Sequence, residues 1–284
     1  MRYSRNVGER NQREVGRWGE EADAGEGTDR REGMNRKKKG LFAGLCLLAA
    51  LLLIGCGWRG KTADPDGENP PDRENAAGNN IAGTEGYLPQ KTVVQIEAGG
   101  IIASAVCVEA EEESGRITLL TSAHGLSALG EGELPEALFA AGQLSEEERI
   151  SCDSCFLSQT ADYAVLTIIN EEAARTLLAG ECVARQDRQA FDALKEGDAC
   201  LAAGGRGGGS AFSGEILSSW IYMEDYGQYM IWAKAEIEPG MSGGGLFDGE
   251  GNLVGILSGG SEDGELAAVP VSIIWSEWEA DGNS

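Results

Sequence analysis

The chain of 284 residues is long enough for one large domain or two small ones, and its 42 glycines indicate a turn-rich, β-rich body. Residues 1–40 are weakly basic, whereas residues 41–284 carry 12 Lys/Arg against 39 Asp/Glu. Because so acidic a body repels phosphate backbones, the composition argues against nucleic acid as a partner.

The N-terminal region has the order of a bacterial export signal. Residues 1–33 are polar and without hydrophobic periodicity, so they are predicted to be a disordered tail or to precede the true start at Met34. Residues 34–56 then combine a basic segment, an apolar run over Leu41–Gly55 and a small-residue end, which is the pattern of a signal peptide. The apolar run is shorter than the roughly 20 residues of a membrane-spanning helix.

The end of this segment, Leu53–Cys56, resembles the lipobox of bacterial lipoproteins, in which the cysteine is lipidated. Cys56 is therefore the expected lipidation site. The alternative is an uncleaved signal anchor with residues 1–40 in the cytoplasm, as the positive-inside rule would orient it. Both interpretations place the body at a bacterial cell membrane, on the extracytoplasmic side. Residues 57–87 contain Asp-Pro and Asn-Pro-Pro among many charges and are predicted to be a disordered linker.

From residue 88 onward, short apolar stretches alternate with clusters of Gly, Asp, Ser or Glu, which predicts an all-β barrel or sandwich. Two further stretches, Glu171–Ala179 and Val271–Glu279, are predicted to be helical. The predicted strands are centred on Val93–Ile96, Ile101–Val108, Ile117–Leu120, Ala164–Ile169, Cys200–Ala203, Ile216–Leu217, Tyr229–Ala233 and Leu253–Leu257.

The body contains five cysteines, an odd number that cannot all pair. The spacing of Cys152 and Cys155 is that of a redox pair or half a zinc site. No second pair at this spacing follows, and no histidine is free to complete a tetrahedral shell. We therefore expect the cysteines to be buried small apolar residues, with at most one disulfide and no metal.

Three segments carry residues suited to acyl transfer. The chain has one histidine, His124, which directly follows an apolar strand, and Asp162 begins another. Ser242 lies in the glycine-rich segment Gly240–Gly245. Glycines allow tight turns that point successive N–H groups into one concavity, and such a concavity beside a hydroxyl can hold an oxyanion.

Together these segments resemble the chymotrypsin/trypsin superfamily, which has the order His, Asp, Ser. The resemblance extends over residues 91–275 and is strongest to the bacterial Deg/HtrA-like branch. It implies two packed antiparallel six-stranded β-barrels, at 88–185 and 186–276, followed by a tail at 277–284. The matching segments are Thr121–Gly125, Asp162–Leu166, Gly240–Leu246, Leu194–Asp198, Ser213–Ile216 and the hairpin Asp248–Ile256.

The resemblance implies a role for each residue. Ser242 is the expected nucleophile, His124 the general base and Asp162 the residue that orients the imidazole. The oxyanion hole is expected at Gly240, Met241 and Ser242. Met241 replaces the usual Asn or Asp of this motif, so activation by a new N-terminus pairing with that acid is not expected.

Substrate contacts are expected from Ser258, Gly259 and Gly260, which match the strand lining the primary specificity pocket. Glu236 lies six residues before Ser242, where an acid facing the pocket would favour Lys or Arg; the alternative is that Glu236 faces solvent. The PDZ domain typical of Deg proteases is expected to be absent.

The sequence thus predicts a membrane-anchored serine endopeptidase that acts on protein or peptide substrates and needs no metal or organic cofactor. The alternative is a catalytically weak or inactive module for peptide binding or envelope-stress sensing, because Met241 and Gly245 depart from the usual nucleophile loop. An α/β-hydrolase esterase would need its histidine after the serine, and one histidine cannot supply the usual ligands of a metalloprotease.

Overall fold

A computed structural model describes residues 88–205, 209–261 and 263–280. The predicted N-terminal tail at 1–33, the signal segment with Cys56 and the linker at 57–87 lie outside the described residues, whereas the first four residues of the predicted tail at 277–284 belong to the last described helix. No helix within the described ranges has the length and apolar character needed to cross a membrane.

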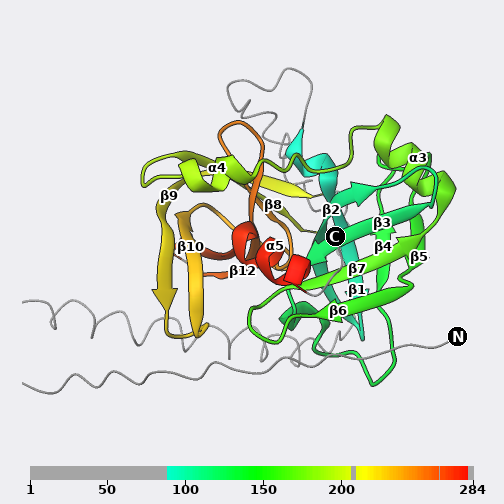
Figure 1. Cartoon of the computed structure of the whole chain (residues 1–284), viewed down its shortest axis with the longest axis horizontal. Helices are drawn as coiled ribbons and strands as arrows, with labels where there is room; N and C mark the ends of the chain where they lie inside the picture. The colour runs from blue at the N-terminus through cyan, green and yellow to red at the C-terminus, as the bar shows by residue number, and fades with distance from the viewer. Residues whose placement is uncertain (1–87, 206–208, 262, 281–284) are drawn as a thin grey trace, which may run out of the picture.

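The first half of the described chain forms one antiparallel sheet of seven strands, in the order β5-β4-β1-β2-β3-β7-β6 (Figure 1). Gly99 and Gly100 form the two-residue turn between β1 and β2. Both have positive φ, as a tight turn between twisted antiparallel strands requires. The strands are β1 (Val93–Ala98), β2 (Ile101–Ala110), β3 (Arg116–Thr121), β4 (Glu136–Phe139), β5 (Glu148–Ser151), β6 (Ser154–Leu157) and β7 (Ala164–Ile169).

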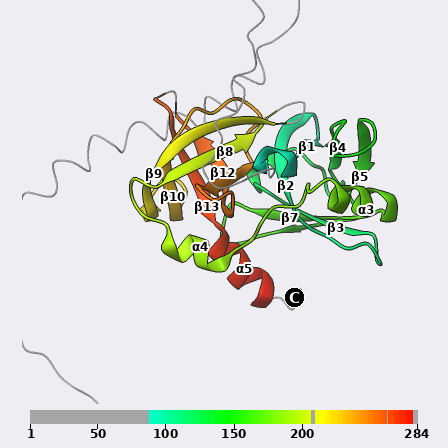
Figure 2. The ribbon, with the colours of Figure 1, turned by 90° about the horizontal axis from the view of Figure 1, so that it is seen from above.

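The second half forms a closed barrel in the order β10-β13-β12-β11-β8-β9, seen beside the first sheet in both Figure 1 and Figure 2. Since every strand of this barrel has two neighbours, the barrel has no free edge. The strands are β8 (Ala199–Gly204), β9 (Ser210–Met223), β10 (Gln228–Lys234), β11 (Gly245–Asp248), β12 (Leu253–Gly260) and β13 (Glu265–Pro270).

Short helices connect and flank the two sheets. The predicted helix at Glu171–Ala179 is confirmed as α3, whose N-cap Asn170 accepts a hydrogen bond from Ala173 N at 3.0 Å. The predicted C-terminal helix is confirmed as α5, and α4 was not predicted. The remaining bounds are η1 (Pro89–Thr92), η2 (His124–Leu126), α4 (Arg188–Ala193) and α5 (Val271–Ala280).

The two faces of the first sheet bury their side chains in different cores. Val106 and Val165 point into the core shared with the closed barrel, whereas their neighbours Cys107 and Leu166 belong to the core of the first sheet itself. Because successive side chains alternate between the two faces of the sheet, one face packs against the barrel and the other forms the sheet's own core. The all-β double-barrel fold is confirmed, with one difference: the first unit has seven strands and ends in the edge strands β5 and β6.

Candidate active site

His124 and Asp162 are brought together by the pairing of β3 with β7. In this register Thr121 is the partner of Ala164, so the residues just beyond these two positions lie at one end of the sheet. Asp162 Oδ2 lies 2.8 Å from His124 Nδ1, and Oδ1 accepts a hydrogen bond from the His124 backbone N–H at 2.9 Å. In the tautomer with a proton on Nδ1, this contact leaves Nε2 free to accept a proton.

The Ser242 loop is packed between the two halves of the molecule. Gly243 has φ 85°, and a Cβ at this position would collide with Ser104 O and Thr121 Oγ1 of the first sheet. A Cβ on Gly244 would collide with Ala203 O of the barrel. Glycine is therefore required at both positions, because the loop backbone lies directly against the sheet on one side and the barrel on the other. This packing places Ser242 beside the end of β3 that leads into His124.

Ser104 on β2 anchors this loop and was missed by sequence reasoning. It is fully buried, its backbone N–H donates to Ser242 O at 2.8 Å and its hydroxyl donates to Gly240 O at 2.7 Å. The same hydroxyl accepts a hydrogen bond from Gly205 N at 2.8 Å. One side chain of the first sheet thus joins two loops of the barrel.

The loop leaves two backbone donors available. Within the described residues, the N–H groups of Gly240 and Ser242 have no hydrogen-bond partner, whereas Met241 N donates to Glu238 O at 3.1 Å. Of the three positions predicted for the oxyanion hole, Gly240 and Ser242 therefore keep free N–H groups. The Met241 side chain is buried in the barrel core, where its sulfur accepts a hydrogen bond from Glu238 N at 3.1 Å.

The described residues show no hydrogen bond between the predicted serine and histidine of the site. The Ser242 hydroxyl makes no hydrogen bond to His124 or to any other residue in the described ranges. His124 is exposed, with 47% of its side chain accessible, and the carboxylate of Asp162 behind it is 19% accessible. Catalytic hydrogen bonds are often long in the absence of substrate and tighten when substrate binds.

The substrate-binding residues predicted from the sequence lie on and beside β12. Ser258 is buried and its hydroxyl has no partner among the described residues. A Cβ on Gly259 would lie 2.6 Å from the Tyr226 hydroxyl, and one on Gly260 would collide with the Ile237 side chain. Glu236 is exposed. The side chain that reaches the glycine strand is therefore Ile237, next to the predicted acid.

The family model described as a trypsin-like peptidase domain matches residues 103–256, a range that contains His124, Asp162 and Ser242. The chain belongs to this trypsin-like peptidase family. The comparison with curated proteins gives no match.

Solved structures agree with this membership. The peptidase domain is similar to the HtrA-type protease AlgW with a tripeptide, at 25% identity and a TM-score of 0.52 over 67% of this chain and 60% of AlgW. It also resembles an inactive form of Rv3671c from M. tuberculosis H37Rv, at 16% identity and a TM-score of 0.51 over 69% of this chain and 89% of that chain. The chain thus spans about three fifths of AlgW, and its likeness to Rv3671c is one of fold.

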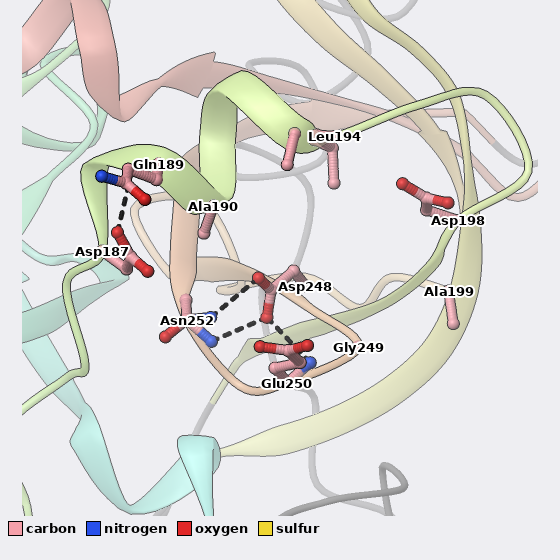
Figure 3. A pocket seen from close by; sticks show the side chains of 11 residues that line it. Asp187, Gln189, Ala190, Leu194, Asp198, Ala199, Asp248, Gly249, Glu250 and Asn252 are labelled. Atoms are coloured by element: carbon pink, nitrogen blue, oxygen red, sulfur yellow. Dashed lines mark hydrogen bonds between the residues drawn. The ribbon is translucent and has the colours of Figure 1, made fainter.

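A shallow acidic pocket lies on the peptidase barrel between α4 and the β11–β12 turn, and none of the predicted catalytic residues lines it (Figure 3). Three of its carboxylates, those of Asp187, Asp198 and Asp248, already have structural partners. Asp187 accepts from Gln189 N at 2.8 Å, and Asp248 accepts from the backbone of Glu250 and both nitrogens of Asn252. The Asp187 contact caps α4, and the Asp248 contacts close the β11–β12 turn. These carboxylates therefore have a structural role in the two turns that border the pocket.

All five described cysteines are free. Burial raises the pKa of Cys107, Cys152 and Cys200 to about 12, which keeps these thiols protonated at neutral pH. Cys155 on the edge strand β6 is only half-buried. The prediction of cysteines as buried apolar residues is confirmed for four of the five.

Proposed function

We propose that the chain is an extracytoplasmic serine endopeptidase, with Ser242, His124 and Asp162 as its triad. The observation that carries the proposal is the joined His124–Asp162 pair beside a serine loop with two unpaired N–H groups. Ser242 Oγ attacks the scissile carbonyl while His124 Nε2 takes its proton, and the Gly240 and Ser242 N–H groups hold the oxyanion. His124 then protonates the leaving amine, and water hydrolyses the acyl-enzyme by the same steps.

Fluorophosphonate labelling of the purified full chain tests this proposal. We expect covalent labelling of Ser242 that is lost in both Ser242→Ala and His124→Ala. Ser127→Ala is the matched control, because Ser127 is an exposed serine three residues from His124 and should not affect the label. A folded chain that takes no label would instead favour the peptide-binding alternative.

A peptide is the proposed substrate, as the AlgW structures with a tripeptide and a decapeptide suggest. Because Glu236 is exposed and Ile237 reaches Gly260, we propose a preference for small apolar residues before the cleaved bond, rather than for Lys or Arg. Glu236→Ala should leave the ratio of Val-type to Arg-type peptide cleavage unchanged. Ile237→Ala should raise cleavage after larger residues. If Glu236→Ala changed the ratio of Val-type to Arg-type cleavage, a preference for Lys or Arg would be supported instead.

Membrane attachment is proposed from the sequence pattern of residues 34–56. Expression in a bacterium with a radiolabelled fatty acid should label the native chain at Cys56 and leave Cys56→Ala unlabelled. An unlabelled native chain that still fractionates with membranes would favour the uncleaved signal anchor.

A further inference from the structure

The last described helix, α5, follows β13 of the barrel and packs against β6 at the edge of the first sheet, near which Figure 1 places it. The Trp278 ring meets Phe156 of β6 edge-on, with ring centroids 5.4 Å apart. Phe156 lies 6.3 Å from the ring of Tyr163, the residue after Asp162. Aromatic packing therefore holds α5 next to the loop that carries the triad aspartate.

One carboxylate on α5 reaches this loop. Ser158 Oγ donates to Glu277 Oε2 at 2.7 Å, and Thr160 Oγ1 donates to Glu277 Oε1 at 2.5 Å. Burial by itself raises the pKa of Glu277, but hydrogen bonds from Thr160, Ser158 and Tyr163 outweigh this effect and hold the pKa below its ordinary value. The charged form of the carboxylate is therefore the one that the loop binds.

The loop between Ser158 and Tyr163 is a closed turn. The Ser158 hydroxyl accepts hydrogen bonds from Thr160 N at 3.2 Å and Ala161 N at 3.0 Å. Ser158 N donates to Tyr163 O at 3.1 Å. Asp162 lies inside this turn, so a group that fixes Ser158 and Thr160 also fixes the backbone from which Asp162 projects.

Asp162 has little other support. Its two oxygens contact His124, and no other side chain in the described part of the chain hydrogen-bonds to them. The hydroxyl of Ser258, though buried, has no partner among the residues that the structure describes. The placement of Asp162 therefore depends on the turn that carries it.

We propose that Glu277 is a positioning residue, which holds Asp162 against His124 through Ser158 and Thr160. The proposal rests on the triad function given above, and it makes the C-terminal helix of the barrel a part of the site's support. The Glu277 carboxylate touches no reacting atom. Its effect is to narrow the range of Asp162 positions, and orientation of this kind contributes strongly to catalytic rates.

The test compares Glu277→Ala and Glu277→Gln with Ser276→Ala in the full chain. Ser276 is an exposed neighbour whose hydroxyl bonds only within its own helix, to Ile273 O at 2.9 Å. Because the chain has a single histidine, the Nδ1 proton resonance of His124 reports directly on the contact with Asp162, provided that the protein carries no histidine tag. Fluorophosphonate labelling rates give the second readout.

We expect Glu277→Ala to move the His124 Nδ1 proton upfield and to slow labelling about tenfold, equivalent to roughly 1.4 kcal/mol. Glu277→Gln keeps one acceptor oxygen and should fall between Glu277→Ala and the native chain, whereas Ser276→Ala should match the native chain. A Glu277→Ala chain with an unchanged His124 resonance and labelling rate would overturn the proposal, even if its unfolding midpoint fell. If the native chain takes no label, the proposed function fails and the resonance comparison still decides the role of Glu277.

Discussion

The two halves of the candidate site are supported in different ways. The nucleophile loop is clamped between the sheet and the barrel by buried main-chain bonds and by Ser104. The turn that carries Asp162 lies at the edge of the open sheet, and partly exposed hydroxyls and a carboxylate hold it. The nucleophile loop is thus held by several buried contacts from both the sheet and the barrel, whereas the Asp162 turn depends on the Glu277 carboxylate of α5.

The clamp on the nucleophile loop should give the largest effect on stability. Gly243→Ala adds a Cβ where Ser104 O and Thr121 Oγ1 already lie, at a φ of 85°. We expect a loss of about 3 kcal/mol or more in the free energy of unfolding, measured by denaturant titration. Gly132→Ala is the control: its φ is 79° with nothing within 4 Å, so only the backbone cost of about 1 kcal/mol should remain. Equal losses in the two variants would mean that the loop is not tightly packed.

Ser104→Ala should cause the next largest loss in the free energy of unfolding. It leaves Gly240 O and Gly205 N without their partner in a buried site, which costs about 2–3 kcal/mol in the free energy of unfolding. Ser122→Ala is the matched control, since Ser122 is equally buried but its hydroxyl has no described partner. That change should stay within about 0.5 kcal/mol. If both serines behaved alike, the anchoring role of Ser104 would be wrong.

Thiol reactivity should differ between Cys155 on the edge strand β6 and the cysteines buried in the two cores. A pKa of about 12 for Cys107 and Cys200, against an ordinary value of 9.0, lowers the thiolate fraction near neutral pH by roughly a thousandfold. Burial also raises the pKa of Cys155, but its side chain on β6 is partly exposed. Mass-spectrometric mapping after iodoacetamide treatment should therefore find Cys155 modified before either core cysteine. Modification of Cys200 first would show that the barrel opens more readily than the sheet edge.

The smallest expected effect is the pH dependence of the hydrogen bonds that Ser158 and Thr160 donate to Glu277. Because the folded-state pKa of Glu277 is lowered, its stabilisation is fully present above the ordinary pKa of 4.5 and is lost as the pH falls through the folded value. The Glu277 carboxylate is only partly buried and is screened by solvent, so the difference in unfolding free energy between the native chain and Glu277→Gln should be only about 0.3 kcal/mol at pH 7. That difference should disappear at the acid end of a pH series. A difference that grows on acidification would contradict the hydrogen-bonded carboxylate.

The sequence predicted the parts of the fold that have a strong local pattern. The apolar stretches at Ala164–Ile169 and the helix at Glu171–Ala179 match β7 and α3 residue for residue. The edge strands β5 and β6 were not predicted, because their side chains are mostly exposed or half-buried and carry no apolar alternation. The closed first barrel was expected from the family resemblance; in the structure this unit is a seven-stranded sheet with β5 and β6 at its edges.

Within the site, sequence reasoning found the residues that a motif marks and missed those that support them. His124 and Asp162 were predicted as partners and the structure joins them at 2.8 Å. Ser104 and Glu277 are an ordinary serine in a strand and an ordinary glutamate in a helix, and their partners lie more than a hundred residues away in the chain. Only the packing of sheet, barrel and α5 reveals such contacts.

The position of α5 in the chain has a consequence for the order in which the site is completed during synthesis. The strands β1 to β7 are contiguous, so the sheet with His124 and Asp162 can form as soon as these residues emerge. Glu277 is made more than a hundred residues later. A nascent chain that has already received Ser242 would therefore still carry an unsupported Asp162 turn until α5 has been made.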